Sequence, residues 1–157
     1  MDKPKPLGEL LYCTLQNLYY HSIQQQEWLL KNGQRPRLFD NCTINLSGPR
    51  QAGFSWALEQ FLLNDCEKAI VVFPTLDMAN RIRNKPNNDI RKRGHIFGSV
   101  ESPSMIKGYS TNTVIFSNYS LMEQTKRKKL EFMEQCLIPV IATPPEAGEY
   151  RTLIRLH

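Results

Sequence analysis

The chain has 157 residues, of which 41% are apolar and 22% are charged. These values are those of one ordinary globular domain, which excludes a disordered tail and a fibrous protein, and no window is apolar enough to predict a membrane span. The net charge is +5, and segment 81–95 alone carries six basic residues against one acidic residue. This concentration of positive charge favours a polyanionic partner.

The N-terminal part, 1–40, is predicted as a helical segment of the same single domain. Residues 7–32 predict a long helix, because leucines recur there at helical spacing up to an Asn-Gly stop. A polar connector then leads to the core, 41–157.

The core alternates between short β-rich runs and amphipathic segments. The predicted strands are 42–47, 68–73, 95–99, 113–116 and 138–142, with a further edge strand in the C-terminal run YRTLIRL. The predicted helices are 55–63, 76–84 and 120–136, and 86–94 is predicted to be a mobile loop. This alternation predicts an α/β domain with a mainly parallel central sheet and helices on both faces. Ligands of such domains bind at the carboxyl ends of the strands, so the turns there are the candidate sites.

The first such turn, GPRQAGFS at 48–55, lies between a predicted strand and a predicted helix. It matches the phosphate-binding pattern G-x-x-x-x-G-K-[ST] except that Phe54 stands where the lysine should be. Glycines let backbone N–H groups wrap phosphates, and the lysine offsets the charge of the β and γ phosphates. Phenylalanine cannot supply that charge, and we interpret Phe54 as a packing residue. The candidate nucleotide-binding residues of this turn are Gly48, Arg50, Gln51, Gly53 and Ser55.

Three more strand-end segments follow in order, namely VVFPTLDMA at 71–79, SPSMIKG at 102–108 and ATP at 142–144. Together with RQAGFS, they resemble the ATPase core of the large terminase subunits of tailed phages, a relative of helicase motor domains. The resemblance covers about residues 42–150. It implies a P-loop NTPase-like three-layer sandwich and a virus-encoded protein, with 142–144 in the place of a coupling motif.

The charged groups of that family's active site are missing. The hydrophobic run at 113–116 ends in Ser117 and Asn118, where the terminase pattern has Asp-Glu. Neutral oxygens are weak Mg²⁺ ligands, and an amide cannot act as a general base. We interpret both residues as strand-end hydrogen bonding or helix capping. The chain is therefore expected to be a catalytically degenerate P-loop module that binds ATP and Mg²⁺ weakly at best, with no catalytic residue and no metal site.

The basic segment supplies the candidate nucleic-acid contacts: Arg81, Arg83, Lys85, Arg91, Lys92 and Arg93. His95, beside them, is a further candidate for phosphate contact, and a second basic run lies at 126–129. We expect a regulatory or assembly factor whose partner is nucleic acid, DNA first, or an acidic surface of a motor or replication protein.

Two alternatives stay open. One is an active but deviant NTPase of DNA packaging or remodelling, with Arg50 in place of the lysine, and the other is a structural virion or assembly protein.

The four cysteines lie far apart in the sequence and form no C-x-x-C pair. This spacing argues against a metal site and favours a cytoplasmic protein, in the host cytoplasm if the protein is viral.

Overall fold

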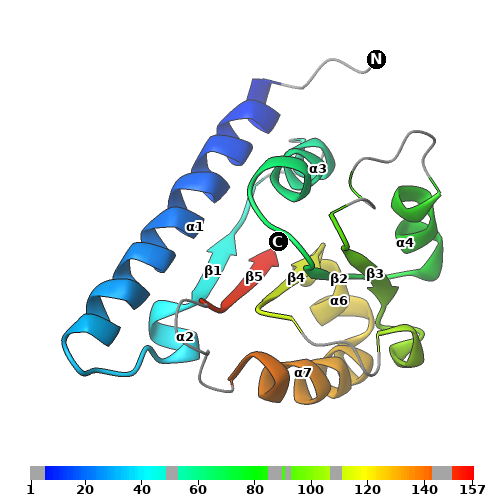
Figure 1. Cartoon of the computed structure of the whole chain (residues 1–157). Coiled ribbons are helices and arrows are strands. Elements are labelled where there is room, and N and C mark those ends of the chain that lie inside the picture. The colour runs from blue at the N-terminus through cyan, green and yellow to red at the C-terminus, as the bar shows by residue number, and fades with distance from the viewer. Residues whose placement is uncertain (1–5, 49–52, 85–89, 91–92, 107–110, 143–149) are drawn as a thin grey trace.

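The computed structural model describes residues 6–48, 53–84, 90, 93–106, 111–142 and 150–157 (Figure 1). Its centre is one sheet of five strands: β1 (Thr43–Leu46), β2 (Ile70–Phe73), β3 (Ile96–Ser99), β4 (Thr113–Ser117) and β5 (Thr152–Leu156). Every neighbouring pair is parallel, in the order β1-β5-β4-β2-β3. The predicted parallel sheet is confirmed.

Helices cover both faces of this sheet. On one face lie α1 (Pro6–Lys31), α3 (Phe54–Asn64) and α4 (Leu76–Arg83), and on the other lie α2 (Leu38–Asn41), α6 (Tyr119–Thr125) and α7 (Arg127–Ala142) (Figure 1). A short 3-10 turn, η1 (Pro103–Met105), follows β3. The molecule is thus the expected α/β sandwich of three layers.

The strands are apolar on both faces because both faces are covered. In β2, Val71 and Phe73 join the core beneath α1, α3 and α4, whereas Ile70 and Val72 join the core beneath α2, α6 and α7. All four side chains are buried. Such an unbroken β-rich run is the pattern expected of a parallel strand inside a three-layer domain.

One predicted strand is wrong. Residues 138–142 form the end of helix α7, in which Leu130, Met133, Leu137 and Ile141 are all buried. Spacings of three and four residues place these side chains on one helical face. A short apolar run cannot be told from a buried helix by periodicity alone, and this one belongs to a helix despite Pro139 inside it.

The C-terminal run is a strand, as predicted, but it is not at an edge. β5 pairs with β1 on one side and with β4 on the other, so the edges of the sheet are β1 and β3.

The segment predicted as one helix, 120–136, is divided between two helices, α6 and α7. The break falls at Lys126, whose Nζ donates to the carbonyl oxygen of Pro74 at 2.8 Å and lies 3.2 Å from a carboxylate oxygen of Glu101.

Helix α1 is joined to the core by polar side chains as well as by leucines. The Asp65 carboxylate at the end of α3 accepts hydrogen bonds from Tyr12 at 2.7 Å, Gln16 at 2.9 Å and Tyr20 at 3.0 Å. Deeper in, the buried amide of Gln26 bonds the backbone carbonyl and N–H of Arg151, at 2.8 and 3.2 Å, just before β5. The N-terminal helix therefore packs as part of the sandwich.

Two further predictions concern residues that lie mostly outside the described ranges. Most of the predicted mobile loop 86–94 lies outside them, although Ile90 is described and is buried. Thr143 and Pro144 of the expected coupling motif lie outside them too, and Ala142 ends a helix rather than a strand. Within the described ranges, no helix is both long and apolar enough to cross a membrane.

Candidate functional site

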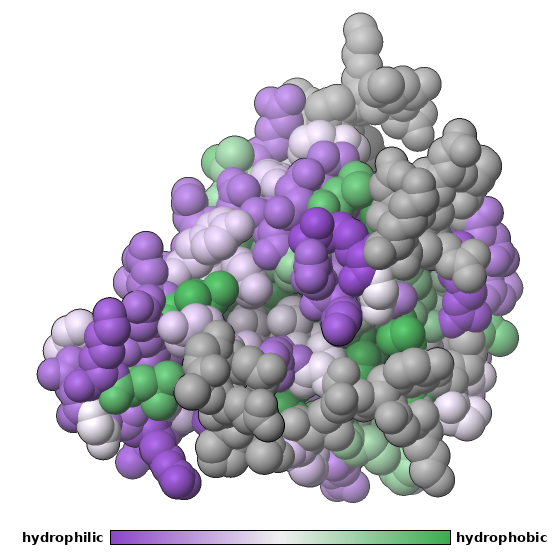
Figure 2. Space-filling view, viewed as in Figure 1, coloured by the Kyte–Doolittle hydropathy of each residue, from purple (hydrophilic) through white to green (hydrophobic). Residues whose placement is uncertain are grey.

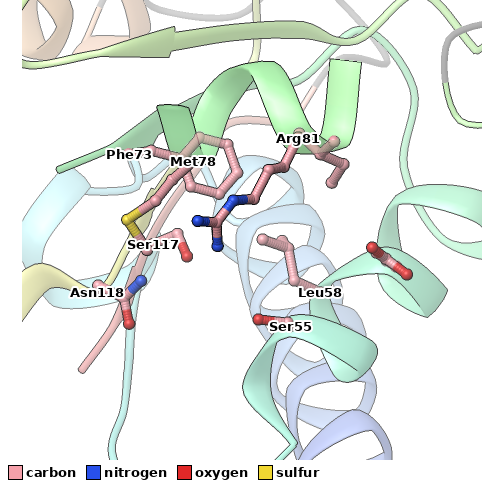
Figure 3. Close-up of a pocket in the computed structure, with 9 residues that line it drawn as sticks. Ser55, Leu58, Phe73, Met78, Arg81, Ser117 and Asn118 are labelled. Atoms are coloured by element: carbon pink, nitrogen blue, oxygen red, sulfur yellow. The ribbon is translucent and has the colours of Figure 1, made fainter. Parts of the chain in front are cut away.

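The strand order creates a crevice between β2 and β4. From β2 the chain passes outward to the edge strand β3, whereas from β4 it passes in the opposite direction to β5. Ligands of open α/β sheets bind at such a switch point, outside the carboxyl ends of the strands. A cleft of about 220 Å³ lies there, between α3 and α4 (Figure 3).

Three parts of the fold line this cleft. Helix α3 contributes Ser55, Leu58 and Glu59, helix α4 contributes Met78, Arg81 and Ile82, and the strand ends contribute Phe73, Ser117 and Asn118. The cleft therefore brings together the serine of the first candidate turn and the two residues at the end of β4. Ser55 is 62 positions from Ser117 in the sequence.

The local structure favours glycine at both glycine positions of the first turn. Gly53 precedes α3 with φ 95° and ψ 24°, a left-handed conformation that side chains rarely adopt. A Cβ on Gly48 would lie 3.1 Å from the ring of Phe54, so a side chain there would require that ring to shift by a few tenths of an ångström. Arg50 and Gln51 lie outside the described residues.

Phe54 faces helix α1. Its partly buried ring packs against a small cluster of Leu11 and Ala57, and it is not among the described residues that line the cleft. The interpretation of Phe54 as a packing residue is confirmed. The position that carries lysine in the phosphate-binding pattern is used here to attach the N-terminal helix.

The end of β4 turns sharply into α6. Asn118 holds φ 59° and ψ 47°, a left-handed conformation that asparagine tolerates better than most residues. Asn118 stands at the position that precedes α6, but its side chain makes no capping hydrogen bond, contrary to expectation. The amide instead borders the cleft beside Ser117 (Figure 3).

Arg81 supplies the positive charge of the cleft. Its guanidinium extends from α4 into the opening, toward Ser117 and across from Leu58 (Figure 3). Among the described residues, no hydrogen bond or ion pair engages it. The sequence grouped Arg81 with the basic loop, although its spacing from Met78 and Ile82 already placed it on the same face of a helix.

Two other predicted nucleic-acid contacts are turned toward the protein. Arg83 donates to the carbonyl oxygen of Phe97, and Arg93 donates to the carbonyl oxygen of Cys66 at 3.0 Å. Both side chains thus contribute to the fold, and their contact with nucleic acid stays a prediction. Lys85, Arg91 and Lys92 lie outside the described residues.

His95, a candidate for phosphate contact, is buried, which argues against that contact. One ring nitrogen, Nδ1, accepts from the Ala69 N–H at 3.0 Å, and Nε2 lies 2.7 Å from the carbonyl oxygen of Leu62. Burial lowers the pKa of His95, and the positive charge of Arg93 lowers it further. The neutral imidazole, with its proton on Nε2, satisfies both neighbours.

The loops at the carboxyl ends of β2 and β3 are tied together by charge. Glu101 accepts from the backbone N–H of Leu76 at 3.3 Å and pairs with Lys126, and the hydrogen bond from Lys126 lowers the pKa of the Glu101 carboxyl. This pair uses part of the second basic run. A further member, Arg127, lies 3.3 Å from Glu131 in its own helix.

Acidic side chains are few among the described residues that line the cleft. Glu59 is the one acid among its described lining residues, and the described part of the chain contains no group of three histidine, cysteine or acidic side chains that could hold a metal ion. The polar side chains that line the cleft are one guanidinium, two hydroxyl groups, one amide and the carboxylate of Glu59. Comparison with known proteins assigns no family: no family model matches the chain, and no curated protein matches it.

Proposed function

We propose that this protein is a non-hydrolysing, P-loop-like module that binds the phosphate groups of nucleic acid and acts as a regulatory or assembly factor. One observation carries the proposal. Ser55, Ser117 and Asn118 come from turns that resemble those holding phosphate and magnesium in P-loop enzymes, and they line one cleft with the cation of Arg81. The terminase-like sequence pattern and the switch-point position support the same conclusion.

The composition of the cleft favours binding over turnover. A working site needs a carboxylate to hold Mg²⁺ and a base to orient water, and the end of β4 offers a hydroxyl and an amide instead. Arginine, serine and asparagine all donate hydrogen bonds to phosphate oxygens. These groups can therefore hold a phosphate without activating it.

The compartment is part of the proposal. All four cysteines are free, and Cys42 and Cys66 are buried. Unpaired buried thiols support a reducing, cytoplasmic location.

Fluorescence anisotropy with duplex DNA across a salt series tests the proposal. Affinity should not depend on sequence, and log affinity should fall with log salt by about 0.9 for each phosphate contact. Replacement of Arg81 with alanine should flatten that slope by about one contact's share. The matched control, Arg35→Ala, removes an exposed arginine far from the cleft in sequence and should bind more tightly than the Arg81 variant.

Absence of DNA binding by the unmodified chain at low salt would contradict the proposal. An acidic protein partner would then be the better candidate, and the protein would be a structural virion or assembly part.

A deviant NTPase is a second candidate, because Ser55 and the end of β4 line the same cleft. In that case Arg50 would supply the missing cation. DNA-stimulated release of phosphate from ATP, abolished by Arg50→Ala but not by Arg35→Ala, would favour the enzyme over the binding module.

A further inference from the structure

The cleft contains an available cation with hydrogen-bond donors around it. Arg81 points inward from α4 and, within the described ranges, has no hydrogen-bonded or ionic partner (Figure 3). Ser55 and Ser117 lie on the opposite walls. The lining acid, Glu59, takes part in an interaction of its own. Arg81 is therefore the charge that this cleft presents to a ligand.

The chemistry of Arg81 selects an oxyanion. A guanidinium group is planar, stays charged at every physiological pH and donates two parallel hydrogen bonds to a phosphate. Hydroxyl and amide groups complete such a site as neutral donors. Because none of these groups is an anion, none of them requires a metal ion to bridge it to the phosphate.

The cleft is small compared with typical ligand pockets. Its volume of about 220 Å³ is below the range of about 300–1,000 Å³ that is typical of pockets for whole small molecules. A single phosphate group suits this space better than a complete nucleotide triphosphate with its magnesium ion.

We infer that the cleft between α3 and α4 binds one phosphate group without a metal ion, and that Arg81 replaces both the P-loop lysine and Mg²⁺ as the neutralising charge. The inference rests on the proposed function for the class of ligand, and it adds the residue, the size of the ligand and the independence from metal. The phosphate can belong to a nucleic-acid backbone or to a free phosphate compound.

Titration of the ¹⁵N-labelled chain with inorganic phosphate tests this inference. One titration contains EDTA, a second contains excess Mg²⁺ and no EDTA, and ionic strength is held constant with sodium chloride in both. Saturable amide shifts are expected at Ser55, Ser117 and Asn118, and added Mg²⁺ should not tighten binding. No saturable shift at these residues, or a requirement for Mg²⁺, would overturn the inference.

Three variants identify the cation. Arg81→Gln should weaken phosphate binding roughly 10- to 100-fold, since a charge-assisted hydrogen bond contributes about 1.5–3 kcal/mol and 1.4 kcal/mol is a factor of ten. Arg81→Lys keeps the charge but loses the paired geometry, and it should fall between Arg81→Gln and the unmodified chain. The control Arg35→Gln should bind like the unmodified chain. Equal binding by the Arg81→Gln and Arg35→Gln variants would contradict the inference.

Arg81 is exposed, so its variants should keep the thermal stability of the unmodified chain. The DNA experiment separates the two proposals. Arg81-dependent phosphate binding without DNA binding would support the inference and contradict the proposed function. DNA binding that Arg81→Gln leaves intact, with no phosphate shifts in the cleft, would support the function and contradict the inference.

Discussion

Phe54→Lys rebuilds the phosphate-binding pattern of the first turn, and we expect it to harm the protein rather than repair it. The Phe54 ring is partly buried against Leu11 and beside Gly48, on the side of α1. Removal of a fully buried phenylalanine costs about 3–5 kcal/mol, so a half-buried one should cost about half of that. The methylene groups of lysine recover part of the loss by covering the same surface.

The free energy of unfolding should therefore fall by about 1–2 kcal/mol, which lowers the melting temperature by roughly 2–8 °C in a chain of this length. Urea unfolding measures the change. The matched control is Phe132→Lys, because Phe132 is 54% exposed on α7, and surface changes usually stay within about 0.5 kcal/mol.

Calorimetry with MgATP supplies the functional test of the same variant. Since the side chain at position 54 faces α1 rather than the cleft, the new ammonium group should not create nucleotide binding. An unchanged stability together with micromolar affinity for MgATP would refute this reasoning. That result would mean that a lysine at position 54 is sufficient to restore nucleotide binding to the turn.

Three further predictions concern the fold. The free energy of unfolding should fall as the pH drops below about 6.5, because burial lowers the pKa of His95 in the folded state and the unfolded state takes up the proton more readily. Above that pH the contribution of His95 is constant. Urea titrations at several pH values measure the change, and the His95→Gln variant should lack it. Asp65→Ala should lower the free energy of unfolding by about 1.5–3 kcal/mol through the lost hydrogen bonds of helix α1, and amide exchange in α1 should rise, whereas unchanged exchange there would contradict the role of Asp65. Gly98→Ala places a Cβ 2.6 Å from Cγ2 of Ile106 and should cost about 1–3 kcal/mol; in a double-mutant cycle, Ile106→Ala should relieve part of that cost, and strict additivity would count against the clash.

Two of the strands that the sequence predicted correctly, β2 and β4, are buried on both faces. Ile70–Phe73 and Thr113–Ser117 lie inside the sheet, where an unbroken apolar run is the pattern typical of a parallel strand. The run at 138–142 failed because its neighbours Leu130, Met133 and Leu137 share a helical face with Ile141. That face becomes visible only when the preceding helix is known to continue.

The position of β5 could not be predicted from local pattern, because strand order depends on pairing between distant segments. Gln26, more than one hundred residues away, holds the start of that strand through hydrogen bonds to Arg151. A polar residue in a predicted helix gives no sign of such a contact. The same limit explains His95, whose neighbours Ala69 and Leu62 decide that it is buried.

The sequence predicted only part of the candidate site. Ser55 was predicted as a nucleotide-binding residue, whereas Ser117 and Asn118 were interpreted as structural residues at a strand end. The parallel sheet brings the turns that carry them to the same edge. Arg81 was identified for another reason, as part of a basic loop. Its direction depends on how α4 packs, and the sequence contains that information only as the spacing of Met78, Arg81 and Ile82.

The most direct test of the central claim is steady-state phosphate release from ATP and GTP, with Mg²⁺ and duplex DNA present. The proposed binding module should show no turnover above a protein-free blank, and Ser117→Ala should not differ from the unmodified chain. Turnover that Ser117→Ala abolishes would contradict the account, because the cleft at the ends of β2 and β4 would then be an active site.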